Sequence, residues 1–226
     1  MLRYFFTSIF HPFKAIKTSL TFNEKFTFLG LALLINYIIF ILCVLLNYNF
    51  SPPLVSAVSE NNISWLFIFP VLIGPLREEI LFRLWLVYSR FNLSCFLGVF
   101  TLTVYLLIQK QNLISNWHQT AIAFVLGFTI FFIAFLFLRR YDNGFRKWFS
   151  NHNRKLTIFS IIAFGYFHLF NFEISTDIIL YSPLLLLSYF ISGYILCSIR
   201  FVIGFKYALL LHIIINVIPS ILFLVI

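Results

Sequence analysis

The chain has 226 residues, of which 62% are hydrophobic and only 10% are charged, and its mean hydropathy is +0.99. A soluble domain carries about 25% charged residues, so this composition excludes an ordinary soluble enzyme and predicts an all-α, polytopic membrane protein. The formal net charge is +9. Because the Lys and Arg residues stand between apolar runs, we expect them to meet the anionic surface of the lipid bilayer, and we expect no nucleic-acid partner.

The first 25 residues combine Arg3, Lys14, Lys17 and Lys25 with aromatic side chains around Pro12. This mixture is typical of a segment that lies at the membrane interface, and it does not resemble a cleaved signal peptide. We therefore divide the chain into an interfacial N-terminal segment, residues 1–25, and a transmembrane domain, residues 26–226.

About seven transmembrane helices are expected, because a helical span needs about 17–20 apolar residues. Residues 49–63 are predicted to form a polar loop, and the basic stretch RRYDNGFRKWFSNHNRK at 139–155 is expected to be a loop as well. The apolar runs cover residues 27–48, 64–90, 93–109, 119–138, 156–172, 178–199 and 205–226.

The distribution of basic residues predicts the orientation. If the N-terminus is cytoplasmic, all Lys and Arg except Arg77 and Arg83, which lie inside the second run, and Lys110 face the cytoplasm, as the positive-inside rule requires. Seven spans then place the C-terminus outside. We expect a multi-pass cell-membrane protein, and the Phe-, Ile-, Asn- and Lys-rich composition suggests a bacterial inner membrane.

The second run contains the sequence GPLREEILFR, which puts ionised side chains into an apolar segment. Pro75 suits the first turn of a helix, so we expect the run to break near Gly74 and a new helix to begin there. Glu78 and Glu79 would then lie in its first turn, where the helix dipole favours carboxylates. Glu79 and Arg83 are four residues apart and can form an ion pair.

Two further polar pairs occur in later runs. Phe164 and His168 share a helix face in FGYFH, and His212 and Asn216 share one in HIIIN. Each pair taken alone is typical of hydrogen bonding inside a helical bundle. Measured from the nearest cytoplasmic basic residue at about 1.5 Å per residue, Glu78 and both pairs lie about 9–20 Å into the membrane. Polar groups at such depth need one another or water, which predicts an intramembrane polar active site.

These residue types suit hydrolysis of an amide. A glutamate beside a histidine can hold and deprotonate a water molecule, and a second imidazole with an amide can donate hydrogen bonds to an oxyanion. Alternatively, a glutamate and two histidines can bind zinc; if a metal is bound, its ligands would be Glu78, His168 and His212. We favour a site without a metal or other cofactor.

In these motifs the chain resembles the CPBP family of intramembrane proteases, which includes the type II CAAX prenyl proteases and bacterial relatives linked to bacteriocin processing. The family pattern EExxxR, FxxxH, HxxxN appears in the same order over residues 65–226. The resemblance implies that Glu78 and His168 activate the water. It also implies that His212 and Asn216 stabilise the oxyanion, with Glu79, Arg83 and Phe164 in supporting positions.

The function that follows is an intramembrane endopeptidase that cleaves a membrane-associated protein or peptide. Two alternatives remain open. A catalytically silent relative would act as a membrane immunity or scaffold protein, and a proton-coupled transporter would use the intramembrane Glu and His residues as a relay.

Overall fold

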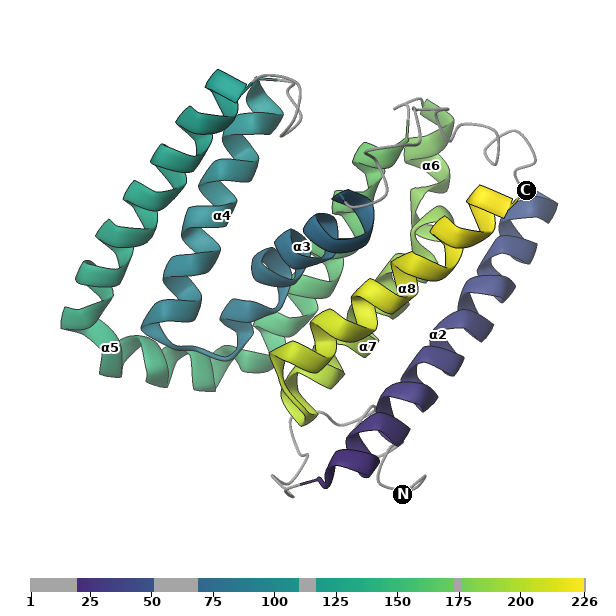
Figure 1. Ribbon diagram of the computed structural model, residues 1–226, viewed down its shortest axis with the longest axis horizontal. Helices are drawn as coiled ribbons and strands as arrows, with labels where there is room; N and C mark the ends of the chain where they lie inside the picture. The colour runs from purple at the N-terminus through teal and green to yellow at the C-terminus, as the bar shows by residue number, and fades with distance from the viewer. Residues whose placement is uncertain (1–19, 51–68, 110–116, 173–175, 226) are drawn as a thin grey trace. The chain divides into compact units, whose positions relative to one another are not determined.

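The computed structural model describes residues 20–50, 69–109, 117–172 and 176–225 (Figure 1), and every regular element in these ranges is helical. This confirms the predicted all-α class. Residues 1–19 of the predicted interfacial segment and residues 51–63 of the predicted polar loop lie outside the described residues. The elements in chain order are α2 (Phe22–Phe50), η3 (Phe69–Ile73), α3 (Gly74–Phe82), η4 (Leu84–Leu86), α4 (Arg90–Ile108), α5 (Trp117–Phe167), η5 (His168–Asn171), α6 (Thr176–Leu185), α7 (Leu187–Val202) and α8 (Phe205–Val225).

Several helices have the length and composition of membrane spans, which supports the membrane assignment. Three stretches qualify, namely Phe22–Cys43, Arg90–Ile108 and Trp117–Asn171. The consecutive helices Ile178–Leu185 and Leu187–Val202 are bent by 41° at their junction and together make a fourth. The described residues therefore contain three or four candidate spans, fewer than the seven predicted.

The second run is not interrupted at the predicted break near Gly74, because helical structure continues on both sides of it. The π-helical turn η3 leads directly into α3. Such a turn is a common way to accommodate a proline, here Pro75, which has no N–H to donate to the helix. The predicted start of a new helix at Gly74 is confirmed, since α3 begins there. The expectation that Glu78 and Glu79 lie in a first turn is wrong, since no acidic residue occupies the first turn of α3.

The basic stretch at 139–155 is helical, which corrects its assignment as a loop and joins the fourth and fifth predicted runs in α5. Only Tyr141, with φ −116° and ψ 17°, departs from helical geometry inside α5. The helix is stabilised here by packing of an apolar side chain. Phe149 is buried, and its ring centroid lies 6.2 Å from that of Trp85. The direction of α5 changes sharply on the left of Figure 1.

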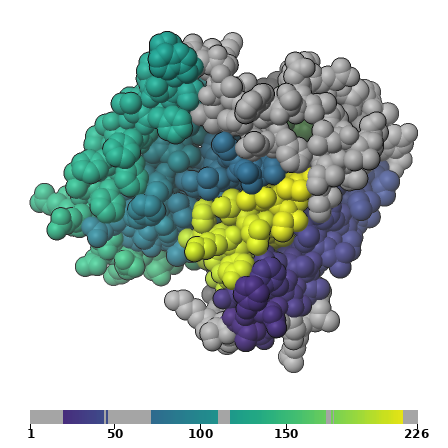
Figure 2. All heavy atoms as spheres, in the orientation of Figure 1, coloured from purple at the N-terminus to yellow at the C-terminus, as the bar shows by residue number. Residues whose placement is uncertain are grey.

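The chain forms two compact units. The first contains the described residues up to Leu76 and from Thr157 onward, and its core joins three helices, α2, α7 and α8. Figures 1 and 2 show α8 alongside α2. The buried core residues are Phe28, Leu29, Ala32, Ile195, Leu196, Ile199, Ala208 and Leu211.

The second unit, Arg77–Leu156, contains α4 and most of α5. These two helices cross at Gly98 and Gly127. A Cβ atom added to either glycine would lie 2.8 Å from the carbonyl oxygen of the other. Only glycine at both positions allows the two backbones to approach this closely.

Candidate functional site

The first motif contains a buried ion pair. Arg83 Nη1 lies 3.0 Å from Glu79 Oε1, and both side chains are completely inaccessible to solvent. The helix ends at this point: the Arg83 N–H still donates to the Glu79 carbonyl, and the 3₁₀ turn η4 follows. The predicted i,i+4 pairing is thus confirmed.

Glu78 occupies the neighbouring position on α3, about 100° around the helix from Glu79. Its side chain is half-buried, whereas that of Glu79 is fully buried. The two adjacent carboxylates therefore have different environments. Glu79 is held by Arg83, and Glu78 is the more accessible of the two.

His168 stands where α5 gives way to η5, and it is 8% exposed. Its Nδ1 lies 2.8 Å from the carbonyl oxygen of Phe164. A carbonyl oxygen can only accept a hydrogen bond, so Nδ1 carries the proton. In the neutral imidazole Nε2 then carries the lone pair and is the ring atom that acts as a hydrogen-bond acceptor.

The second and third motifs meet at one aromatic ring. The Phe164 ring packs edge-on against His168, with centroids 4.6 Å apart, and edge-on against His212, with centroids 5.8 Å apart. His212 is 3% exposed, and Phe164 is buried as well. Asn216 follows His212 by one turn of α8 and is half-buried. Two imidazoles from distant parts of the chain thus contact the same phenylalanine ring.

Three contacts around this cluster were not predicted from the sequence. The Tyr189 ring of α7 stacks on His168, with centroids 4.0 Å apart and ring planes inclined by 28°. The phenol of Tyr37 donates a hydrogen bond to the Ile215 carbonyl, 3.0 Å away, and so links α2 to α8 next to the third motif. Gly165 has no room for a Cβ atom, because the Phe190 ring occupies that space. Tyr189, Tyr37 and Phe190 lie outside the motifs, and each contacts a motif residue that is distant in sequence.

The motifs divide between the two units. Glu78, Glu79 and Arg83 belong to the unit Arg77–Leu156, whereas Phe164, His168, His212 and Asn216 belong to the other. Within the described residues, no three His, Cys, Asp or Glu side chains converge in a way that fits a metal ion.

Comparisons of the chain with protein-family models, with curated proteins and with solved structures find no match.

Proposed function

We propose that this chain is an intramembrane endopeptidase that hydrolyses a peptide bond of a membrane-associated protein or peptide. The observation that carries the proposal is the buried pair of imidazoles, His168 and His212, which both contact the Phe164 ring. Buried polar side chains in membrane helices are costly and mark functional sites. The order and spacing of the motifs, which resemble those of the CPBP proteases, support the same reading.

The fixed tautomer of His168 suggests its task. With the Nδ1 proton donated to the Phe164 carbonyl, Nε2 accepts a hydrogen bond from the attacking water and orients it. Glu78 accepts a proton from this water as its oxygen attacks the scissile carbonyl carbon. The same carboxyl group then delivers the proton to the leaving amine nitrogen, and the peptide bond breaks to give a carboxylic acid, which keeps the second proton of the water, and an amine.

His212 and Asn216 stand one helical turn apart on α8. An imidazole N–H and a side-chain amide N–H can both donate to the oxyanion that forms when water adds to the carbonyl. Glu79 and Arg83 fix the end of α3 and leave Glu78 as the reactive carboxylate. The architecture that the proposal requires is a polytopic membrane protein with its polar active site inside the bilayer.

The test compares protein termini in membranes from the wild-type strain with those from strains carrying Glu78→Gln or His168→Gln. We expect termini that appear only in the wild type, at one cleavage site in one or a few membrane proteins or peptides. Glu24→Gln removes a carboxylate at the start of α2, and His152→Gln removes an imidazole that also contacts a carbonyl four residues earlier, that of Trp148. Both control variants should retain the wild-type termini.

The proposal also requires Glu78 and His168 to act on one water molecule. The double variant should therefore be no slower than the slower single variant, because residues that act as a unit have non-additive effects. If Glu78→Gln is present at the wild-type level and all termini are unchanged, the endopeptidase is ruled out. A non-catalytic immunity or scaffold role would then be the better explanation of the motifs.

A further inference from the structure

The outer surface of α5 is hollowed where the helix bends. An open groove of about 460 Å³ lies here, lined by Phe137, Tyr141, Gly144, Phe145 and Trp148. Its position along the chain is informative, because the apolar part of α5 ends at Leu138 and two arginines follow. The groove therefore begins in the last turn of this apolar part and continues into the basic stretch.

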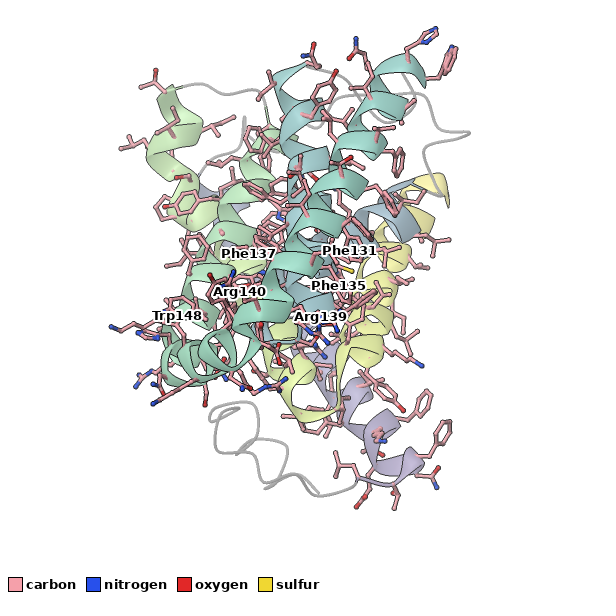
Figure 3. The ribbon with its side chains drawn as sticks, turned by 90° about the vertical axis from the view of Figure 1, so that its left-hand side faces the viewer. Phe131, Phe135, Phe137, Arg139, Arg140 and Trp148 are labelled. Carbon is pink, nitrogen blue, oxygen red and sulfur yellow. The ribbon has the colours of Figure 1, made fainter. Side chains whose placement is uncertain are left out.

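The groove opens on the side of α5 away from α4. Gly127 and Phe131 pack against Gly98 of α4, and Phe135 stacks on Phe131. Figure 3 places Phe131, Phe135 and Arg139 along one side of α5, and Phe137, Arg140 and Trp148 along the other. In the second group the exposed fractions are 57% for Phe137 and 48% for Trp148. These large aromatic surfaces face outward, where a membrane helix meets lipid.

Positive charge borders the groove. The guanidinium carbon of Arg140 lies 5.8 Å from the ring centroid of Tyr141, one of the lining residues, and the exposed Lys147 precedes Trp148 in the chain. Asp142 is the only acidic residue between 139 and 155. Its carboxylate accepts a hydrogen bond from Tyr88, 3.1 Å away, and forms an ion pair with Arg146 at 3.3 Å. The charge of Asp142 is thus compensated by Arg146 and by the hydrogen bond from Tyr88.

We infer that this groove binds an anionic phospholipid, with an acyl chain along Phe137, Tyr141 and Trp148 and the headgroup phosphate against Arg140. Three observations carry the inference. The lining is aromatic, the volume falls in the range of about 300–1,000 Å³ that small-molecule sites have, and the charge at the polar end complements a phosphate. This inference requires α5 to lie in a bilayer, but it does not require the chain to be a peptidase.

Gly144 provides a way to block the site. A Cβ atom at this glycine would meet no other atom within 4 Å, because the position opens into the groove. The leucine side chain would start from open space and extend into the groove, and leucine is also a better helix former than glycine. Gly144→Leu should therefore keep the helix and exclude the acyl chain.

The experiment uses the fluorescence of Trp148 in the full chain, reconstituted into phosphatidylcholine vesicles that contain brominated phosphatidylglycerol or, at the same mole fraction, brominated phosphatidylcholine. Bromine on an acyl chain quenches a tryptophan that it touches, and a Trp148→Phe blank on each background isolates the signal of Trp148. We expect the groove to prefer phosphatidylglycerol by about five-fold, the factor that corresponds to one basic side chain at an anionic membrane surface.

Variants test whether the preference for phosphatidylglycerol arises from binding in the groove. Arg140→Gln should abolish the preference for phosphatidylglycerol, and Gly144→Leu should reduce the quenching by both lipids. Arg139→Gln removes the same charge from the adjacent residue on the opposite side of α5, and it should retain most of the preference. Far-UV circular dichroism checks that each variant is folded; if Gly144→Leu is not, the two arginine variants decide the question. Equal quenching of the wild type by the two lipids, or equal losses in Arg139→Gln and Arg140→Gln, would overturn the inference.

Discussion

The Glu79 carboxylate and the Arg83 guanidinium lie 3.0 Å apart with both side chains fully buried, one helical turn from each other at the end of α3. Removing one partner leaves an uncompensated buried charge, which costs about 3–5 kcal/mol, whereas replacing the whole pair by apolar groups is often neutral. We expect Arg83→Met to lower the free energy of unfolding by that amount. Thermal unfolding in detergent micelles measures the effect.

The matched control for this prediction is the double variant Glu79→Leu/Arg83→Met. It should be clearly more stable than Arg83→Met, because no charge is then left without its partner. A double variant that is as unstable as the single one would mean that the ion pair contributes more than charge compensation to this end of α3.

The close crossing of α4 and α5 gives a second prediction. Ala at Gly98 or Gly127 would place a Cβ atom 2.8 Å from a backbone carbonyl oxygen, so the helices must separate. We expect either variant to lose about 1–3 kcal/mol of stability, as overpacked sites do. Gly30→Ala is the control, since a Cβ atom there meets nothing within 4 Å and alanine is favoured in helices. Equal melting temperatures for all three variants would contradict the close approach of α4 and α5 at Gly98 and Gly127.

The features that the sequence predicts correctly involve residues that lie within one helical turn of each other. The pairing of Glu79 with Arg83, the contact of Phe164 with His168 and the change of helix at Gly74 all follow from spacing or from the chemistry of proline. The roles assigned to these residues stay predictions. Spacing cannot reveal Tyr189 stacked on His168, because that contact joins α7 to the end of α5.

The number of spans was harder to predict for a similar reason. Hydropathy locates apolar runs, but it does not show where a helix bends or continues. The charges at 139–155 therefore predict a loop, but in the structure the helix continues through them, and Phe149 packs against Trp85 and Tyr88. Only the contact with another part of the fold distinguishes an amphipathic helix from a basic loop here.

Tyr88 gives a prediction for pH. Burial, together with the hydrogen bond to Asp142, raises the pKa of the Tyr88 phenol to about 12 from an ordinary value of 10.0. The folded state therefore favours the protonated phenol, and this stabilisation is complete below about pH 10 and is lost as the pH rises through about 12. At neutral pH, Tyr88→Phe should be less stable than the wild type by about 1 kcal/mol.

That difference between the wild type and Tyr88→Phe should shrink between pH 10 and 12, because only the wild type has this phenol to ionise. Melting temperatures recorded across this range measure it. Tyr181→Phe, which removes an exposed phenol, is the control. A difference that stays constant to pH 12 would show that ionisation of Tyr88 is not coupled to folding.

Gly165 and Phe190 give a prediction about the site itself. A Cβ atom at Gly165 would overlap the Phe190 ring, so Gly165→Ala must displace either the ring or the end of α5 that bears His168. If the chain is an endopeptidase, cleavage by Gly165→Ala should fall by roughly ten-fold, since small misplacements of a reacting group are costly. Phe190→Leu in the same chain makes room and should restore part of the rate. A double variant as slow as Gly165→Ala would contradict this steric explanation.

Tyr189 provides the last prediction, because it is the ring that holds His168 from the side of α7. Aromatic pairs contribute about 0.5–1.5 kcal/mol beyond their buried area, so loss of the stacked ring should allow the imidazole to leave its position. In the proposed endopeptidase, Tyr189→Leu should lower kcat by about 3- to 10-fold with little change in KM. Tyr189→Phe keeps the stacked ring, 4.0 Å from the imidazole in the wild type, and should retain the wild-type kcat. If Tyr189→Phe is as slow as Tyr189→Leu, the hydroxyl group and not the stacking is what the reaction needs. A rise in KM alone would instead place Tyr189 in substrate binding, because His168 acts on the water and not on the substrate's affinity.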